Sequence, residues 1–242
     1  MHVCVFTDVH ADERALQSIL DAATRQGIKH FWCLGDFCSG GREPRQCFDI
    51  VMEYCEQVLL GNHEMFVVMH AWSANIKGGW AEAARYASEQ LGVERVERLS
   101  DITSHALTAE AELVHGSLLD PTNDFLLGAR SAQRNLALLR RSLLIFGHTH
   151  KPVYWLPSKN GRWAKELEIE VGVHYDLPDS LELPDSYLRR TFARPDGCLL
   201  NPGSGCDDMG ARWLELEISD GKRKATWHQT NIPGHGGTPC PA

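Results

Sequence analysis

The chain has 242 residues, of which 43% are hydrophobic and 23% are charged, so it can bury a sizeable core. Its formal net charge is −8 and it contains no block of Lys and Arg, which argues against stable nucleic-acid binding. No apolar run is long enough to span a bilayer, and no signal-like leader precedes the first strand-like run, so we expect a cytoplasmic protein without a membrane partner. Eight cysteines occur without a CxxC pair and are interpreted as reduced thiols.

Apolar runs and turn residues predict alternating strands and helices over the first 150 residues. Asp12 is a predicted helix N-cap, and Gly92 is predicted to end a helix. Residues 65–79 show a mixed pattern and are expected to be irregular or partly helical. The predicted strands are 2–7, 31–34, 58–60, 105–108, 112–114 and 143–146, and the predicted helices are 13–26, 44–54, 80–91 and 131–141.

Beyond residue 150 the pattern changes to short alternating runs. Half-buried antiparallel strands are predicted at 153–156 and 167–171, joined by a turn at 158–161. The Pro-rich, acidic segment 174–195 is predicted to be a long surface loop, and the tail 232–242 to be disordered. Closing strands are predicted at 199–200, 213–218 and 225–228, with a hairpin turn at Asp220-Gly221.

The most informative stretch is Gly61-Asn62-His63-Glu64, which follows the predicted strand 58–60. It places an amide, an imidazole and a carboxylate where a buried strand is expected to turn into a loop. Similar polar residues follow four other predicted strands. Because parallel strands joined by helical crossovers end at the same edge, we expect these side chains to converge on one crevice. The eight candidate groups are Asp8, His10, Asp36, Asn62, His63, His115, His148 and His150.

Aspartate, histidine and asparagine donors suit divalent transition-metal ions, and no cysteine belongs to the set. Two ions are expected, because a single ion would leave several buried charged or imidazole groups without a partner. Asp8 and His10 are two residues apart, so an extended segment directs both to the same side, as it does for His148 and His150. Four other histidines follow no such pattern and are interpreted as ordinary groups: His30, His70, His174 and His228.

In their order along the chain, these motifs resemble the pattern of the calcineurin-like metallophosphoesterases. The resemblance spans residues 3–150 and, through an Asn-Pro-Gly-Ser turn at 201–204, extends more weakly to about residue 230. That turn is similar to one in the small bacterial branch, which includes phosphodiesterases and dinucleoside-polyphosphate hydrolases. The matching motifs are Asp8-Val9-His10, Gly35-Asp36, Gly61-Asn62-His63-Glu64, His115-Gly116 and Gly147-His148-Thr149-His150.

The resemblance implies an α/β fold, a four-layer α-β-β-α sandwich of two mixed sheets flanked by helices. It also implies two divalent metal ions bridged by Asp36, with manganese expected first and iron, zinc, nickel or cobalt as alternatives. We expect residues 1–231 to form one such domain, with an insertion or lid around 158–196. The implied ligands are Asp8, His10, Asp36 and His150 for one ion, and Asp36, Asn62, His115 and His148 for the other.

The implied activity is hydrolysis of a phosphodiester or nucleotide-type phosphoanhydride, with a hydroxide held between two ions attacking phosphorus in line. His63 is expected to donate a proton to, or stabilise, the leaving oxygen. The alternatives are a phosphomonoesterase acting on small molecules or proteins and, with lower weight, a scaffold that keeps the fold without catalysis. The partner expected is a small phosphorylated substrate such as a nucleotide; the oligomeric state does not follow from the sequence.

The sequence also departs from the protein-phosphatase branch of that family after Asp36. That branch continues into a segment with an aspartate and an arginine, and its aspartate supports the catalytic histidine, whereas this chain has Ser39 there. Arg42 and Arg45 are nearby candidates for contacting a substrate phosphate. The partner that orients His63 and the role of Glu64 stay open at this point.

Overall fold

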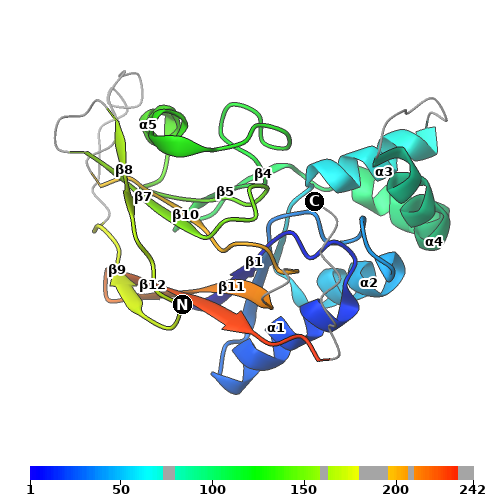
Figure 1. Cartoon of the computed structure of the whole chain (residues 1–242), viewed down its shortest axis with the longest axis horizontal. Coiled ribbons are helices and arrows are strands. Elements are labelled where there is room, and N and C mark those ends of the chain that lie inside the picture. Colours follow the sequence, from blue (N-terminus) through cyan, green and yellow to red (C-terminus); the bar gives the residue numbers. More distant parts are fainter. Residues whose placement is uncertain (73–79, 159–162, 180–195, 207–209, 234–242) are drawn as a thin grey trace.

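Two six-stranded β-sheets pack face to face in the computed structural model, with helices on their outer sides (Figure 1). This arrangement confirms the α/β sandwich of two mixed sheets flanked by helices. The structure describes residues 1–72, 80–158, 163–179, 196–206 and 210–233. Residues 159–161 of the predicted turn, residues 180–195 of the predicted surface loop and lid, and most of the predicted tail therefore lie outside the described residues.

The first sheet combines strands from both ends of the chain. Its strands are β1 (His2–Phe6), β2 (His30–Cys33), β3 (Gln57–Val58), β9 (His174–Asp176), β11 (Ala211–Ser219) and β12 (Lys222–Thr230). Their order is β3-β2-β1-β11-β12-β9. The strands β1, β2 and β3 are parallel to one another. On the other side of β1, the strands β11, β12 and β9 follow in that order, each antiparallel to the strand before it. Asp220 and Gly221, both with positive φ, form the predicted turn between β11 and β12.

The second sheet has the strand order β4-β5-β6-β10-β7-β8. Its strands are β4 (His105–Leu107), β5 (Glu112–Val114), β6 (Leu143–Ile145), β7 (Val153–Pro157), β8 (Ala164–Leu167) and β10 (Cys198–Asn201). Here β5, β6 and β10 are parallel, and the remaining strands are antiparallel to their neighbours. The five strands predicted to end at polar motifs are thus divided between two sheets.

The helices form where the local sequence favours them. The Asp12 side chain accepts a hydrogen bond from the Ala15 N–H at 2.9 Å and so caps α1, and Pro44 is the first residue of α2. In the part of the chain that the structure describes, no helix has both the length and the apolar composition needed to cross a bilayer. The helices are α1 (Glu13–Arg25), α2 (Pro44–Tyr54), α3 (Asn62–Trp72), α4 (Trp80–Ser100) and α5 (Gly128–Leu138).

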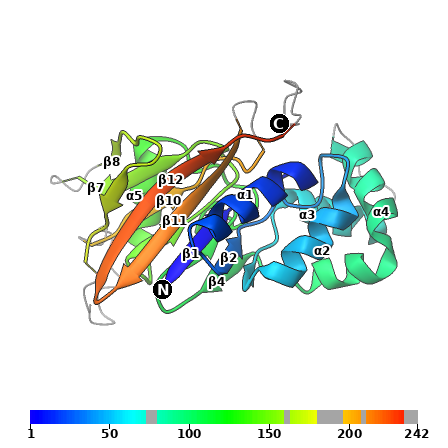
Figure 2. The ribbon, with the colours of Figure 1, turned by 90° about the horizontal axis from the view of Figure 1, so that it is seen from below.

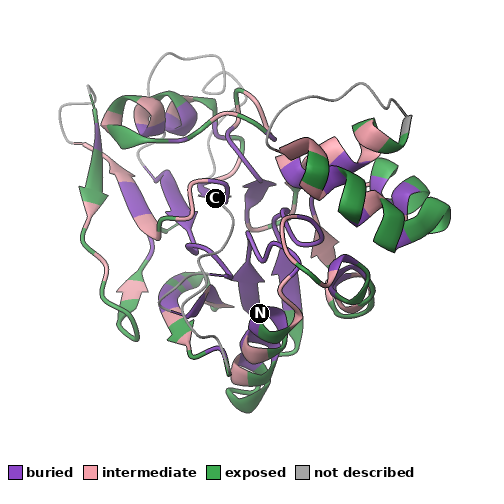
Figure 3. Ribbon diagram, turned by 45° about the vertical axis from the view of Figure 1, so that its right-hand side comes forward, coloured by how far each residue is buried: buried purple, intermediate pink, exposed green. Residues whose placement is uncertain are grey.

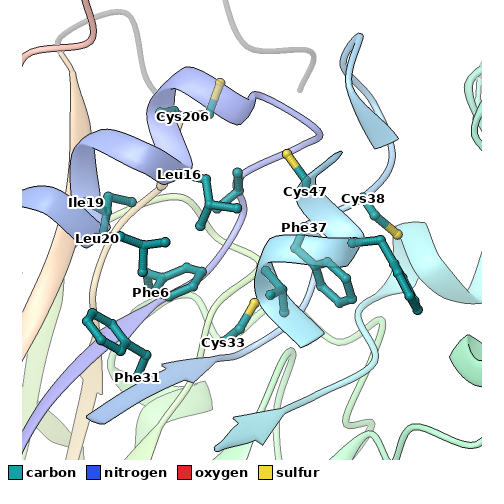
Figure 4. Close-up of a cluster of buried hydrophobic side chains, with 14 of the residues drawn as sticks. Phe6, Leu16, Ile19, Leu20, Phe31, Cys33, Phe37, Cys38, Cys47 and Cys206 are labelled. Atoms are coloured by element: carbon teal, nitrogen blue, oxygen red, sulfur yellow. The ribbon is translucent and has the colours of Figure 1, made fainter. Parts of the chain in front are cut away.

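Three hydrophobic clusters occupy the three spaces between the layers. Alternate residues of β1 serve different clusters: Val3 and Val5 pack between the sheets, whereas Phe6 faces the helices. Figure 4 shows the helical side, where Leu16 and Leu20 of α1 lie over Phe6. Figure 3 shows that buried residues fill the central strands and that exposed residues lie on the outer faces of the helices. This rigid double sheet fixes the positions of the strand ends.

Four sequence-based boundaries were wrong in detail. The 61–64 stretch does not lead into a loop, because α3 begins at Asn62. Gly92, with φ 72° and ψ 169°, ends the helical geometry as expected, but a second helical segment follows directly and continues to Ser100. The strand expected at 167–171 is β8, which lies earlier in the chain and pairs with β7. Residues 174–176 are not loop, because they form β9 on the edge of the first sheet.

Candidate metal centre

The strand ends bring together the side chains that the sequence singled out. Asp8 and His10 follow β1, Asp36 follows β2, and the Asn62-His63 pair opens α3 just after β3. His115 follows β5, and the His148–His150 pair follows β6. Both sheets therefore contribute to one cluster, which contains three overlapping groups of ligands. Within each group, the ligand atoms lie within 4.8 Å of one another. Those groups are Asp8, His10 and His150; His10, Asp36 and His63; and Asp36, His115 and His148.

The backbone at these positions has an unusual conformation. Five of the expected ligands have φ between 51° and 65°, in the left-handed region that non-glycine residues rarely adopt. Each such residue costs about 1–3 kcal/mol unless its surroundings enforce the conformation. The five are Asp8, His10, Asp36, His148 and His150. Such a concentration of strained residues is typical of a functional site.

The two buried aspartates each use one carboxylate oxygen to hold the loops and leave the other facing the cluster. Asp8 Oδ2 accepts a hydrogen bond from the His148 N–H at 3.0 Å, and Asp36 Oδ1 accepts one from the His63 N–H at 2.9 Å. Asp8 Oδ1 is buried and has no hydrogen bond of acceptable geometry, although His150 Nε2 lies 3.3 Å away. A buried carboxylate oxygen without a donor is costly, and a divalent cation would compensate it. The residues present therefore fit a metal ion.

Backbone carbonyls fix which nitrogen each of three imidazoles presents to the cluster. A ring N–H that donates to a carbonyl leaves the other ring nitrogen as a lone-pair donor for a metal. His10 and His115 are held through Nδ1 and present Nε2, whereas His148 is held through Nε2 and presents Nδ1. The donor–acceptor pairs are His10 Nδ1 with Ser39 O (3.3 Å), His115 Nδ1 with Leu34 O (2.9 Å) and His148 Nε2 with Asn123 O (3.2 Å).

Distances within the cluster agree with two overlapping sets of ligands. On one side, His150 Nε2 lies 3.1 Å from His10 Nε2. On the other side, His115 Nε2 lies 3.2 Å from Asp36 Oδ2 and 3.1 Å from Asn62 Oδ1. Asp36 belongs to groups on both sides, which is the position expected of a bridging carboxylate.

The electrostatics of the cluster favour negative carboxylates next to imidazoles. Burial opposes ionisation of Asp36, but the charge of His115 outweighs it and holds the pKa of that carboxyl far below its usual range. Burial likewise opposes ionisation of Asp8, but His150 and His115 lower its pKa overall. For His115, burial is outweighed by Asp36, which raises the imidazole pKa to about 9. At His10, burial has a larger effect than the nearby Asp36 and lowers the imidazole pKa to about 4. A cation would replace the proton that His115 carries at neutral pH.

His63 is oriented by packing. Its ring meets His10 edge to face at a centroid distance of 4.5 Å and Trp80 at 4.7 Å, and its Nε2 lies 3.9 Å from Asp36 Oδ2. Among the described residues, none forms a hydrogen bond to its imidazole nitrogens. Ser39, which stands where the protein-phosphatase branch has aspartate, contacts His10 through its carbonyl instead. Within the described part of the chain, both ring nitrogens of His63 are therefore without a hydrogen-bond partner.

Glu64 acts as a clamp on the backbone of two loops. Its Oε2 accepts hydrogen bonds from the N–H groups of Asp36 (2.7 Å) and Gly61 (3.1 Å). Its Oε1 accepts them from the N–H groups of Phe37 (2.9 Å) and Cys38 (3.0 Å). Sequence reasoning did not find this role, because all four donors are backbone N–H groups and leave no side-chain pattern. Three of them belong to a loop 26–28 residues earlier in the chain. The carboxylate fixes the loop after β2 against the start of α3.

Gly61 is required where these two loops touch. A Cβ atom there would lie 2.1 Å from Asp36 Oδ1 and 2.6 Å from the Asp36 backbone nitrogen. Only glycine permits this approach without displacing the carboxylate. The first residue of the motif thus positions Asp36 by leaving space for it.

The Asn-Pro-Gly-Ser turn supports the opposite side of the cluster. The Asn201 side-chain amide donates to the Gly147 carbonyl at 2.8 Å and lies 3.1 Å from Thr149 Oγ1. Ser204 Oγ lies 3.0 Å from the Asp8 carbonyl oxygen. Both residues are buried, so the turn contributes by holding the backbone on which His148 and His150 stand.

The two expected substrate-binding arginines lie outside the cluster. Arg42 is exposed in the loop before α2, where its carbonyl accepts a hydrogen bond from the Tyr86 hydroxyl at 2.9 Å. Arg45 is exposed on α2 and lies 3.9 Å from Asp49, which also accepts two hydrogen bonds from Arg95. Their contact with a substrate phosphate stays a prediction.

A double-sheet sandwich with buried carboxylates and imidazoles at its strand ends defines the class of metal-dependent α/β hydrolases. A protein-family model, the calcineurin-like phosphoesterase superfamily domain, matches residues 1–169. The chain belongs to the calcineurin-like phosphoesterase superfamily, which confirms the family that the five motifs indicated. The divalent metal ions expected from the motifs agree with this family and with the ligand groups described above.

Known structures share the fold over nearly the whole chain. A metallophosphoesterase from Sphaerobacter thermophilus superposes with a TM-score of 0.76 at 23% identity, covering 96% of this chain and 89% of that one. A hypothetical protein from Pyrococcus horikoshii superposes with a TM-score of 0.68 at 14% identity, with the same coverages of 96% and 89%. An uncharacterized protein of Methanocaldococcus jannaschii is 30% identical over 66 residues, and this match spans only 27% of each of the two chains.

Proposed function

We propose that this chain hydrolyses phosphodiesters or nucleotide-type phosphoanhydrides with the help of two divalent metal ions. The observation that carries the proposal is the buried Asp8 Oδ1, which lacks a hydrogen bond although Nε2 atoms of His10, His115 and His150 lie 3.3–4.0 Å from it. Family membership supports the reaction class, and the overlapping ligand groups support two ions rather than one.

The proposed ligands are those that the motifs indicated. When bound, two ions would lower the pKa of a water molecule and bind the non-bridging oxygens of a phosphoryl group. Asp36 would bridge, and Asn62 Oδ1 would complete the second set beside His115. Manganese is the ion to test first. The first set is Asp8, His10, Asp36 and His150, and the second is Asp36, Asn62, His115 and His148.

His63 is proposed as the proton donor to the leaving oxygen. Its ring lies beside the cluster, and no hydrogen bond from a described residue holds its nitrogens. We expect His63→Ala to lower kcat by roughly 10²–10⁴-fold, the usual contribution of a general acid. Bound metal, measured by elemental analysis of the purified variant, should be unchanged.

The control for that variant is His30→Ala, since His30 is an exposed histidine on β2 that pairs with Glu56. This control should keep both turnover and metal. Loss of one ion in His63→Ala would show instead that His63 is a ligand, because His10, Asp36 and His63 also form a group of suitable geometry.

A diester or nucleotide substrate is favoured by aromatic side chains at the rim of the cluster. Phe125 stacks on the His148 ring with centroids 3.9 Å apart and is 52% exposed, so its other face is open to a ligand. Trp80 contacts His63 on the opposite side. An aryl ring or nucleobase attached to the phosphate could stack on Phe125 and gain about 0.5–1.5 kcal/mol beyond its area burial.

We therefore expect Phe125→Ala to raise KM for an aryl or nucleotidyl diester by about 3–10-fold, equivalent to that stacking energy, and to change kcat little. The effect should be smaller for a diester in which methyl replaces the aryl group that does not leave. Steady-state kinetics with bis(p-nitrophenyl) phosphate and with methyl p-nitrophenyl phosphate, which share the leaving group, would measure the difference. Leu107→Ala, another exposed apolar residue on β4, is the matched control.

The proposal is tested by a substrate screen of protein reconstituted with manganese. The panel comprises phosphomonoesters, aryl diesters, cyclic nucleotides and dinucleoside polyphosphates. A higher kcat/KM for monoesters would favour the phosphomonoesterase alternative. Inactivity on every substrate with both ions bound would favour the non-catalytic scaffold.

A further inference from the structure

A second group of potential metal ligands lies on the first sheet, away from the centre described above. His2 on β1, Glu215 and Glu217 on β11, and His228 on β12 all point to the helix-facing side of the sheet. Figure 2 shows the start of β1 next to β11 and β12. At about 3.3 Å per residue along a strand, His2 lies roughly 20 Å from Asp8, so the two groups cannot share an ion.

The side chains of this group meet around a single carboxylate. His2 Nε2 lies 2.5 Å from Glu215 Oε1, and His228 Nε2 lies 2.7 Å from Glu215 Oε2. His2 Nε2 also lies 3.9 Å from Glu217 Oε1, and one atom from each of His2, Glu215 and Glu217 falls within 4.8 Å of the others. These spacings bracket the roughly 3.3 Å that separates ligand atoms about 2.0–2.1 Å from a tetrahedral ion.

The scaffold under this group is rigid. His2 is the direct antiparallel partner of Glu217, and Glu215 stands two residues from Glu217 on the same face. The His228 ring stacks on Trp213 with centroids 4.1 Å apart and an angle of 15° between the planes. Two paired strands therefore hold the ligand atoms of His2, Glu215 and Glu217, and the stacked His228 ring holds the Glu215 carboxylate from β12.

Access and charge also suit a cation. Glu215 is 5% exposed, whereas the side chains of His2 and Glu217 are 35% and 43% exposed, so an ion can enter from solvent. Two carboxylates balance a divalent charge, and the His2 imidazole completes a set of three protein donors, which leaves one position of a tetrahedral ion for solvent. The pair of His30 and Glu56, 2.6 Å apart, differs from this group. It forms an ordinary hydrogen bond and, among the described residues, belongs to no group of three possible ligands.

We infer that His2, Glu215 and Glu217 form a surface site for one divalent transition-metal ion such as zinc, cobalt or nickel, and that His228 orients Glu215 through its second carboxylate oxygen. An ion there would link β1 and β11 at the end of the sheet opposite the strand ends that carry Asp8 and Asp36. The donors exclude a preference for calcium or magnesium, which favour all-oxygen ligands.

The test is equilibrium dialysis of the chelator-treated full chain against zinc, followed by elemental analysis. His2→Gln and Glu217→Gln should each bind one zinc ion fewer than the unmodified chain, or bind it at least about 10-fold more weakly. His30→Gln, the matched control, should bind the same number as the unmodified chain. Both test residues are partly exposed, and circular dichroism will establish that the variants are folded.

A zinc-dependent rise in the thermal unfolding midpoint gives a second readout that does not depend on activity. At the same zinc concentration, this rise should be smaller in His2→Gln than in the unmodified chain and unchanged in His30→Gln. Equal zinc content and equal affinity in His2→Gln, Glu217→Gln and the unmodified chain would overturn the inference, as would loss in only one of the two variants.

Discussion

Asp36→Asn should lower kcat at least about 10³-fold, because the carboxylate proposed to bridge the two ions is replaced by a neutral amide. The amide oxygen can still accept the hydrogen bond from the His63 N–H, so the loop should keep its shape. We expect metal content to fall together with turnover. Both are measured on one preparation, by elemental analysis and by diester hydrolysis at saturating manganese.

Asp21→Asn is the matched control, since Asp21 is exposed on α1 and accepts only a hydrogen bond from Gln17. That variant should keep full activity and full metal content. If Asp36→Asn turned over diesters at the rate of the control, the two-ion assignment built on Asp36 would have to be abandoned.

Glu64→Ala should destabilise the fold as well as the site. Truncation leaves four buried backbone N–H groups without an acceptor, and each costs about 1–3 kcal/mol. We expect the free energy of unfolding to fall by roughly 3 kcal/mol or more, measured by urea denaturation. Metal affinity should fall as well, because Asp36 loses the anchor of its own backbone.

Glu64→Gln is a variant of intermediate effect. Its amide keeps one acceptor oxygen but places an NH₂ group next to the other two N–H donors. It should lose less stability than Glu64→Ala. Glu89→Ala on the surface of α4 should lose almost none. Equal unfolding free energies for the Glu64 variants and the surface control would contradict the proposed clamp.

The strand ends could be predicted from the sequence because each one combines an apolar run with polar residues. Asp8, Asp36 and His115 stand directly after runs that could only be buried strands, and the sheets place them together. The edge strands were harder to predict. β9 and β8 have weak apolar alternation, and their positions are set by pairing with β12 and β7 rather than by their own residues.

The contacts that prepare the site could not be predicted for a different reason. The carbonyls of Leu34, Ser39 and Asn123 orient imidazoles, but a backbone acceptor is the same whatever side chain it carries. The stacking of Phe125 on His148 likewise depends on the path of a loop. Glu64 was visible as a motif residue, yet its partners were fixed only by the close approach of two loops at Gly61.

The strand order also bears on how the protein is made. The residues after 150 supply none of the proposed ligands, yet β11 is the neighbour of β1 and β10 is the neighbour of β6. When only the first 150 residues have left the ribosome, every proposed ligand has been synthesised. At that stage β1 and β6 each still lack one hydrogen-bonded neighbour. The sheets that position the proposed ligands are therefore complete only when β10 and β11, from the last part of the chain, have joined them.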